Sequence, residues 1–352
     1  MSEFKNEKNL SKEQVDLVVA LYSSGKFKET IDTIYLLNKE FPNVPLLFNI
    51  LGASYKSLKH FDKSVLMFER AIAIKEDYSE AHKNLGVTYK ELNQLSKAVD
   101  CFKNALKNNP NYIDALYSLA NTYKALGELD NALNCYQRVI DINSSFAEAH
   151  NNIANTLKDL GRLEESLNSY NTAININPNI AEIHNNLGNA LKDMENLSAA
   201  LKSYNNALSI NPKFSEAYYN KGIVLKRLRK LHESVENFSK AIDINPDFAE
   251  AYNNLGSSLN ALGKSSEAIK CCEKAISLKP NYAEAYNNFG NILKDLRMSD
   301  AAEKYYEKAI EIKPEYAEAY SNLGTIYSDK KNKEKALVFY QKAHKIDPHI
   351  DF

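Results

Sequence analysis

Residues 249–282 read AEAYNNLGSSLNALGKSSEAIKCCEKAISLKPNY, and residues 283–316 read AEAYNNFGNILKDLRMSDAAEKYYEKAIEIKPEY. Both stretches are 34 residues long, open with the same six residues, carry glycine at position 8 and have proline at position 32. Self-similarity at a fixed period of this length is the signature of a repeat architecture. The fold is therefore decided by one unit and by how often that unit recurs.

Proline marks the same grid along the chain, at Pro42, Pro110, Pro178, Pro212, Pro246, Pro280, Pro314 and Pro348, and Glu76 and Ser144 fill the other two points. The grid predicts ten units, at 11–44, 45–78, 79–112, 113–146, 147–180, 181–214, 215–248, 249–282, 283–316 and 317–350. We expect residues 1–10 to be a disordered N-terminal tail and residues 351–352 to be a short tail.

The unit 11–44 departs most from the pattern, because Val18 stands at position 8 and Thr30 at position 20. Terminal repeats are usually atypical, so we interpret this unit as a degenerate N-terminal capping repeat. Ser11 and Gln14 have the spacing of a capping box.

The recurring residues suit two packed helices in each unit. Apolar spacings of three and four predict helix A at positions 2–14 and helix B at positions 18–30. Glycine or alanine at position 8, with serine or alanine at position 20, is expected to let two helix backbones approach. Aromatic residues at position 24 fill the space between helices, and alanine at position 27 leaves room for the next unit. Proline at position 32 ends helix B.

This pattern resembles the tetratricopeptide repeat, with tyrosine, histidine, phenylalanine or leucine in place of its tryptophan. The resemblance implies an all-α fold: a right-handed superhelix, or α-solenoid, of about ten helix-turn-helix repeats. Such a solenoid presents helix A on its concave face.

Asparagines line helix A at places that packing does not explain. Position 6 holds Asn84, Asn152, Asn186, Asn220, Asn254, Asn288 and Asn322, and position 9 adds Asn121, Asn155, Asn189 and Asn291. Asparagine is a mediocre helix former, but its amide both donates and accepts hydrogen bonds. A row with one such asparagine on each successive helix A would hold the backbone of an extended peptide. The alternative is that the amides bond between repeats or only solvate the groove.

The strings Asn151-Asn152-Ile153-Ala154-Asn155, Asn185-Asn186-Leu187-Gly188-Asn189 and Asn287-Asn288-Phe289-Gly290-Asn291 resemble the superhelix of the O-GlcNAc transferase family. In that family a position-6 asparagine ladder holds substrate backbones. The resemblance implies a second function: a substrate-recognition arm of a protein glycosyltransferase whose catalytic domain lies outside this chain. Tetratricopeptide co-chaperones instead grip acidic tails with a lysine clamp. That clamp is absent, because Lys83 is the one lysine at position 5 and Val87 stands at position 9.

Composition narrows the partner class. The chain has 44 Lys and Arg against 45 Asp and Glu, so its net charge of -1 argues against nucleic acid as the main partner. No apolar run is long enough for a membrane span. Neither a P-loop nor an H-E-x-x-H motif occurs, so we expect no enzyme activity, no cofactor and no metal site.

The remaining expectations concern location and assembly. The four cysteines include no C-x-x-C pair, which favours reduced thiols in a cytoplasmic protein. After the helix B of unit 317–350 the sequence offers no polar covering helix. We therefore expect self-association or a further domain at this uncapped end. His82, His150 and His184 at position 4 are interpreted as packing residues, and the basic run Lys221, Lys226, Arg227, Arg229 and Lys230 as a solvated face.

Overall fold

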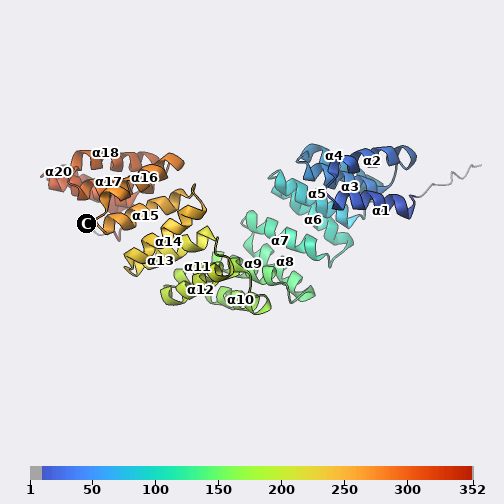
Figure 1. The fold of residues 1–352 in the computed structure, drawn as a ribbon, viewed down its shortest axis with the longest axis horizontal. Helices are drawn as coiled ribbons and strands as arrows, with labels where there is room; N and C mark the ends of the chain where they lie inside the picture. Colours follow the sequence, from blue (N-terminus) through green and yellow to red (C-terminus); the bar gives the residue numbers. More distant parts are fainter. Residues whose placement is uncertain (1–9, 351–352) are drawn as a thin grey trace, which may run out of the picture. The chain divides into compact units, whose positions relative to one another are not determined.

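The structure, a computed structural model, describes residues 10–350 of the chain. The predicted tails lie outside the described residues, except for Leu10, which packs against the first hydrophobic cluster. Residues 10–350 form twenty α-helices and no β-strand (Figure 1). The fold is an α-solenoid of consecutive helix pairs, as the sequence predicts.

Each of the ten predicted units contains one helix pair. The first five pairs are α1 (Lys12–Ser23) and α2 (Phe27–Glu40), α3 (Pro45–Ser57) and α4 (Phe61–Ile74), α5 (Ser79–Glu91) and α6 (Leu95–Asn108), α7 (Ile113–Ala125) and α8 (Leu129–Ile142), and α9 (Ala147–Asp159) and α10 (Leu163–Ile176). The other five are α11 (Ala181–Asp193) and α12 (Leu197–Ile210), α13 (Ser215–Arg227) and α14 (Leu231–Ile244), α15 (Ala249–Ala261) and α16 (Ser265–Leu278), α17 (Ala283–Asp295) and α18 (Ser299–Ile312), and α19 (Ala317–Asp329) and α20 (Lys333–Ile346).

Local chemistry explains where the helices begin and end. From α5 on, helix A spans positions 1–13 and helix B spans positions 17–30, each starting one residue before the predicted bound. Helix A is followed by a residue in the left-handed region at position 15, such as Gly161 (φ 75) or Arg297 (φ 60). In the eight units with proline at position 32, helix B stops because the residue before a proline is disfavoured in the helical region; α4 and α8 end at the same position without one. The predicted capping box is confirmed: the backbone N–H of Ser11 donates to Gln14 Oε1 at 2.9 Å, and that of Gln14 donates to Ser11 Oγ at 3.3 Å.

The core repeats with the sequence. The aromatic side chain at position 24 and the alanine at position 27 are fully buried in most units, for example Tyr306 and Ala309. We expected the position-8 glycine to let two backbones approach, and at Gly256 a Cβ would lie 3.1 Å from the backbone oxygen of Ala268; at most other position-8 glycines the nearest group is a ring. A Cβ on Gly290 would lie 2.6 Å from Cε1 of Tyr306, so the missing side chain makes room for the aromatic ring.

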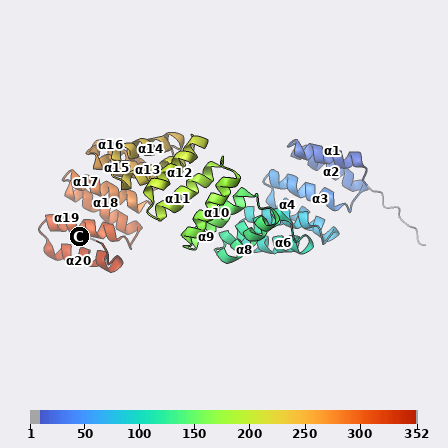
Figure 2. The ribbon, with the colours of Figure 1, turned by 90° about the horizontal axis from the view of Figure 1, so that it is seen from below.

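The chain divides into two compact units, Met1–Pro178 and Asn179–Phe352, which we describe separately. The first contains α1–α10 and the second contains α11–α20, and within each unit the helix pairs follow one another in order (Figure 2). Inside a unit, neighbouring odd-numbered helices contact one another directly, such as α3 with α5 and α17 with α19. Among residues 10–350, neighbouring even-numbered helices make no comparable contact. The odd-numbered helices therefore line the inner side of the curve within each unit.

Candidate functional site

We call the surface made by the odd-numbered helices the A face. A hollow of about 420 Å³ on the A face of the second unit is lined by residues of α15, α17 and α19 alone. It brings together three of the predicted asparagines, Asn288, Asn291 and Asn322, with Lys294 and Asp295 beside them. Positions 6, 9, 12 and 13 of helix A therefore share one surface.

All seven position-6 asparagines are half-buried. Four of them donate a hydrogen bond from Nδ2 to Oδ1 of the position-5 asparagine in the preceding repeat: Asn84 to Asn49 (3.0 Å), Asn220 to Asn185 (3.1 Å), Asn288 to Asn253 (2.8 Å) and Asn322 to Asn287 (2.9 Å). Each donor and acceptor are 35 residues apart, one more than the repeat length. The position-6 asparagines thus form hydrogen bonds between adjacent repeats, as the alternative interpretation of this row predicted.

Two further members of the row use a tyrosine hydroxyl in the same way. Asn152 Nδ2 donates to the hydroxyl of Tyr117 at 2.8 Å, and Asn254 Nδ2 donates to the hydroxyl of Tyr219 at 3.2 Å. Both tyrosines occupy position 5. One side of the amide therefore faces the neighbouring repeat in six of the seven cases.

The position-9 asparagines have a core partner that the sequence reading missed. The buried tyrosine at position 24 of the same unit donates its hydroxyl to the asparagine Oδ1: Tyr136 to Asn121 (2.5 Å), Tyr170 to Asn155 (2.5 Å), Tyr204 to Asn189 (2.8 Å) and Tyr306 to Asn291 (2.8 Å). The same pairing can be seen in the sequence. Where position 24 is Phe68, Phe102 or Phe238, position 9 is Ala53, Val87 or Ile223.

These internal bonds orient the amides of Asn288, Asn322 and Asn291. At Asn288 and Asn322 the NH₂ group is engaged between repeats, so the carbonyl oxygen is the group left to accept. At Asn291 the carbonyl oxygen is engaged by Tyr306, so the NH₂ group is left to donate. In the second unit, Asn288 and Asn322 therefore offer their carbonyl oxygens as acceptors, and Asn291, one helical turn from Asn288, offers its NH₂ group as a donor.

A row of lysines at position 12 also lies on the A face and was not singled out from the sequence. Its members are Lys56, Lys90, Lys124, Lys158, Lys192, Lys226 and Lys294, and all are half-buried. Lys124 pairs with Asp159 at 3.2 Å, and Lys226 donates to Ser257 Oγ at 2.8 Å. Their recurrence on the 34-residue grid was the signal that could have found them.

The acidic row at position 2 is partly neutralised. Lys279 lies 2.9 Å from Glu250, and Lys313 lies 3.3 Å from Glu284. The hydrogen bond from Lys279 lowers the pKa of the Glu250 carboxyl, which burial alone would raise. Together with their place in the first turn of helix A, these pairs support the interpretation of position 2 as a partner of the helix dipole.

Other candidates have structural partners. His82 and His150 approach the carbonyl oxygens of Glu76 and Ser144 at 2.9 and 3.2 Å, as packing residues would. Within the described part of the chain, no group of side chains could hold a metal ion and no helix is long and apolar enough to cross a membrane. In the basic run, Arg227 pairs with Glu195 at 3.0 Å and Lys230 with Glu233 at 3.3 Å, and these side chains are exposed, but Lys221 and Lys226 are half-buried, so the interpretation as a solvated face holds for only part of the run.

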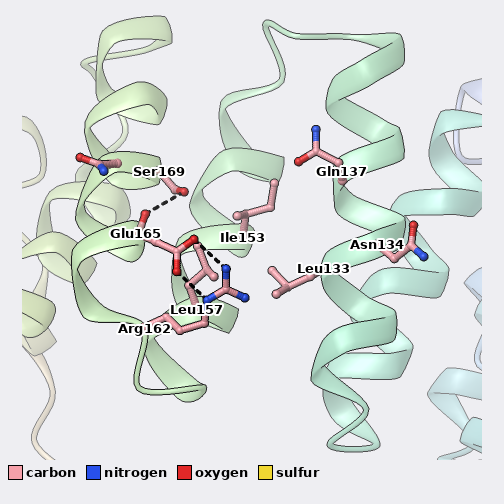
Figure 3. A pocket seen from close by; sticks show the side chains of 9 residues that line it. Leu133, Asn134, Gln137, Ile153, Leu157, Arg162, Glu165 and Ser169 are labelled. Atoms are coloured by element: carbon pink, nitrogen blue, oxygen red, sulfur yellow. Dashed lines mark hydrogen bonds and ion pairs between the residues drawn. The ribbon is translucent and has the colours of Figure 1, made fainter.

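A second hollow, of about 540 Å³, lies between α8, α9 and α10 (Figure 3). Leu133, Ile153 and Leu157 contribute its apolar wall. Its charged residues satisfy each other, since the Arg162 guanidinium donates twice to the Glu165 carboxylate, at 2.7 and 2.6 Å. We therefore assign no ligand to this hollow.

Comparisons with known proteins agree with the repeat pattern. Family models described as TPR repeat match residues 120–161, 154–195 and 230–263. Models described as tetratricopeptide repeat match residues 79–112, 181–214, 249–282 and 317–350, residues 47–78 and 283–316, and residues 101–134 and 203–236. Together they cover the chain from residue 47 to residue 350. A comparison with curated proteins found no match.

Several solved structures are similar to parts of the chain. YrrB, described as a TPR protein with an unusual peptide-binding site, is 30% identical over 51% of this chain and 93% of its own, with a TM-score of 0.41. MamA is 26% identical over 46% of this chain and 95% of its own, also with a TM-score of 0.41. Pseudomonas aeruginosa pilF is 17% identical over 58% of this chain and 93% of its own, with a TM-score of 0.51, which speaks for the fold alone.

Proposed function

Because the chain belongs to the tetratricopeptide repeat family, we propose that it is a non-catalytic interaction scaffold whose A face binds extended protein segments by their backbone. The observation that supports this most is the fixed direction of the amides at positions 6 and 9. A backbone offers one N–H donor and one C=O acceptor per residue. An acceptor row beside a donor row is the complement of such a chain.

The spacing also suits an extended segment. Packed helices lie about 8–10 Å apart, and an extended chain advances about 3.3 Å per residue. One repeat therefore corresponds to about three residues of ligand. The proposed contact residues are the position-6 row, Asn84, Asn152, Asn186, Asn220, Asn254, Asn288 and Asn322, and the position-9 row, Asn121, Asn155, Asn189 and Asn291. Since the contacts go to the backbone, the ligand's side chains would be only weakly restricted.

The test uses a 12-residue peptide selected from a random display library on the wild-type chain. We expect the double variant Asn288→Ala, Asn322→Ala to bind this peptide at least tenfold more weakly. Replacing a peptide bond by an ester, which removes one N–H donor, should weaken binding more than most side-chain truncations do. Equal affinity of the ester and amide peptides would contradict backbone recognition.

A matched control separates binding from stability. Asn287 is 2% exposed and its Oδ1 accepts the hydrogen bond from Asn322. Asn287→Ala therefore removes an inter-repeat bond without removing a position-6 amide. We expect it to lower the unfolding temperature and to weaken peptide binding less than the double variant does, because Asn322 keeps its amide but loses the bond that orients it. If this variant loses binding as completely as the double variant, the position-6 amides act through stability and not as contacts.

The second candidate, a recognition arm for a glycosyltransferase resembling O-GlcNAc transferase, uses the same ladder and rests on the asparagine strings. It differs in what the chain is joined to. Sequencing the transcript past the codon for Phe352 tests it: an open reading frame for a catalytic domain is expected, and a stop codon would exclude the version in one polypeptide.

Two further proposals concern location and assembly. The four cysteines are free thiols, and burial raises the pKa of Cys101 and Cys272 to about 12, which suits inert packing thiols in a reducing cytoplasm. On α20, Leu337 and Val338 are 57% and 49% exposed, and we propose self-association or a further domain there. Sedimentation at rising concentration tests self-association, and a constant monomer mass would count against it.

A further inference from the structure

Three lysines on the A face of the first unit lack ion-pair partners. Lys56 on α3 and Lys83 and Lys90 on α5, which we call the Lys56–Lys90 patch, are all half-buried. Among residues 10–350, none of their ammonium groups lies within 4.0 Å of a carboxylate oxygen. The nearest aromatic contact is that of Lys83, whose Nζ lies 6.0 Å from the ring centroid of Tyr112. The patch therefore carries positive charge that no ion pair within residues 10–350 neutralises.

One member of the lysine row, Lys124, shows what a neutralised lysine looks like. Position 12 faces position 13 of the following repeat, 35 residues later: Lys124 pairs with Asp159 at 3.2 Å, and Asn260 donates to Asp295 Oδ2 at 2.6 Å. By the same offset, the residue facing Lys90 is Ala125, which offers no charge. The alanine explains why Lys90 stays unpaired.

Lys56 is the neighbouring case. The offset places Glu91 opposite it, but this carboxylate lies beyond 4.0 Å from the ammonium group. Burial lowers the pKa of Lys56, the positive charge of Lys83 lowers it further, and Glu91 opposes both effects. Burial likewise lowers the pKa of Lys90, again opposed by Glu91. The charged forms of both lysines are thus poorly solvated, and an external anion would stabilise them.

We propose that the Lys56–Lys90 patch binds an acidic stretch of the protein segment that occupies the A face, with side-chain carboxylates three residues apart on Lys56 and Lys90. This inference rests on the proposed function. Lys56 and Lys90 occupy the same position on adjacent A helices, about 8–10 Å apart. A polyproline-II segment advances about 3.1 Å per residue with three residues per turn. Every third side chain of such a segment therefore points to the same side, and these side chains are about as far apart as Lys56 is from Lys90.

The neighbourhood favours a peptide over a nucleic acid. Asn84, which donates to Asn49, lies beside Lys83 and continues the amide row through the patch. Glu80 lies on α5 with Lys83 and Lys90, and Asp114 lies on the following helix α7; both carboxylates would repel a continuous phosphate backbone. A peptide with a carboxylate at every third residue and neutral residues elsewhere avoids repulsion by the position-2 carboxylates.

The experiment measures fluorescence anisotropy with three labelled 12-residue peptides in a proline-rich background. One has glutamate at every third position, one has glutamine at those positions, and one has the same number of glutamates at consecutive positions. We expect the wild-type chain to bind the first peptide at least tenfold more tightly than the second and at least threefold more tightly than the third. The preference should shrink as salt rises, because partly exposed charges are screened.

Variants locate the effect. Lys56→Gln with Lys90→Gln should remove the preference for glutamate. Ala125→Asp should reduce it at least threefold, because it gives Lys90 the partner that Asp159 gives Lys124. Ala125→Ser and Lys107→Gln, an exposed lysine on α6, are the matched controls and should change little. Circular dichroism and thermal unfolding check that every variant keeps its helices.

The outcomes are distinct. Equal affinity of the wild-type chain for the glutamate and glutamine peptides would overturn the acidic-segment proposal and leave backbone binding standing. An effect of Lys107→Gln as large as that of the double variant, or tighter binding of a 12-nucleotide single-stranded DNA than of the glutamate peptide, would also overturn it. Failure of the proposed function would appear differently, as unchanged binding in the Asn288 and Asn322 double variant.

Discussion

Replacing Tyr306 by phenylalanine removes one hydroxyl group from the middle of the second unit and leaves the ring in place. The ring of Tyr306 is fully buried, and its hydroxyl donates to Asn291 Oδ1 at 2.8 Å. In the unit 215–248 the chain itself places Phe238 and Ile223 at these two positions. The pair can therefore be tested as a pair, with a native apolar alternative as the reference.

The expected free energies follow from the contacts. Tyr306→Phe loses one neutral hydrogen bond and should lower the free energy of unfolding by about 0.5–1.5 kcal/mol. Asn291→Ile leaves the buried Tyr306 hydroxyl without its acceptor and should cost about 1–3 kcal/mol. The double variant restores an apolar pair of the kind found at Phe238 and Ile223. We therefore expect it to be at least 1 kcal/mol more stable than the sum of the single changes predicts.

Urea unfolding followed by circular dichroism gives the overall stability of the four proteins in this cycle. Because long repeat arrays depart from two-state unfolding, hydrogen exchange of α17 and α18 should be measured as well, since it reports the local free energy of opening. Additive effects of the two changes, with a coupling below about 0.3 kcal/mol, would refute the assigned pairing. Tyr204 and Asn189 provide an independent copy of the same pair at the same distance.

Three further outcomes are expected. Gly290→Ala places a Cβ 2.6 Å from the Tyr306 ring and should therefore lower the free energy of unfolding in urea by about 1–3 kcal/mol. An unchanged free energy of unfolding would show that the ring moves freely. Arg297→Gly relieves a left-handed backbone (φ 60) and should raise stability by about 0.5–1 kcal/mol in the same assay, and a lower stability would contradict the assigned strain. Burial raises the pKa of Tyr112 to about 12 and also raises that of Tyr316. Because tyrosines in the unfolded chain ionise near pH 10, stability should be complete below pH 10 and fall as the pH rises towards 12. Tyrosinate absorbance followed with circular dichroism checks this, and ionisation of all 22 tyrosines near pH 10 with full helicity would contradict it.

The helix pairs could be predicted because the same packing residues recur at the same positions in ten successive units. Pro178 and its equivalents mark the end of helix B in eight of the ten units, and the period carries the same boundary to the units with Glu76 and Ser144. The role of Gly290 was predicted only in part. A glycine shows that something approaches closely, but the sequence does not say whether it is a backbone or a ring.

The candidate site was less predictable, for a geometric reason. That asparagines such as Asn288 lie on the A face follows from their position on helix A. Which end of each amide is engaged depends on the stagger between adjacent A helices, and the period of 34 does not give that stagger. The structure shows that partners lie 35 residues apart. The pairing of Tyr306 with Asn291 was visible as a correlation between positions 24 and 9, because the repeats serve as an internal alignment.

The 35-residue offset also explains why the ladder is interrupted at Ser118. The residue 35 places before Ser118 is Lys83, whose ammonium group donates and cannot accept. An asparagine at position 118 could therefore not donate to this residue as the other position-6 amides donate to their position-5 partners. Every other unit from 79–112 onward has asparagine at position 6, preceded at this offset by asparagine or tyrosine, which can accept. The break in the ladder at Ser118 therefore coincides with Lys83, the one lysine at position 5, because this neighbour cannot accept the bond that a position-6 amide donates.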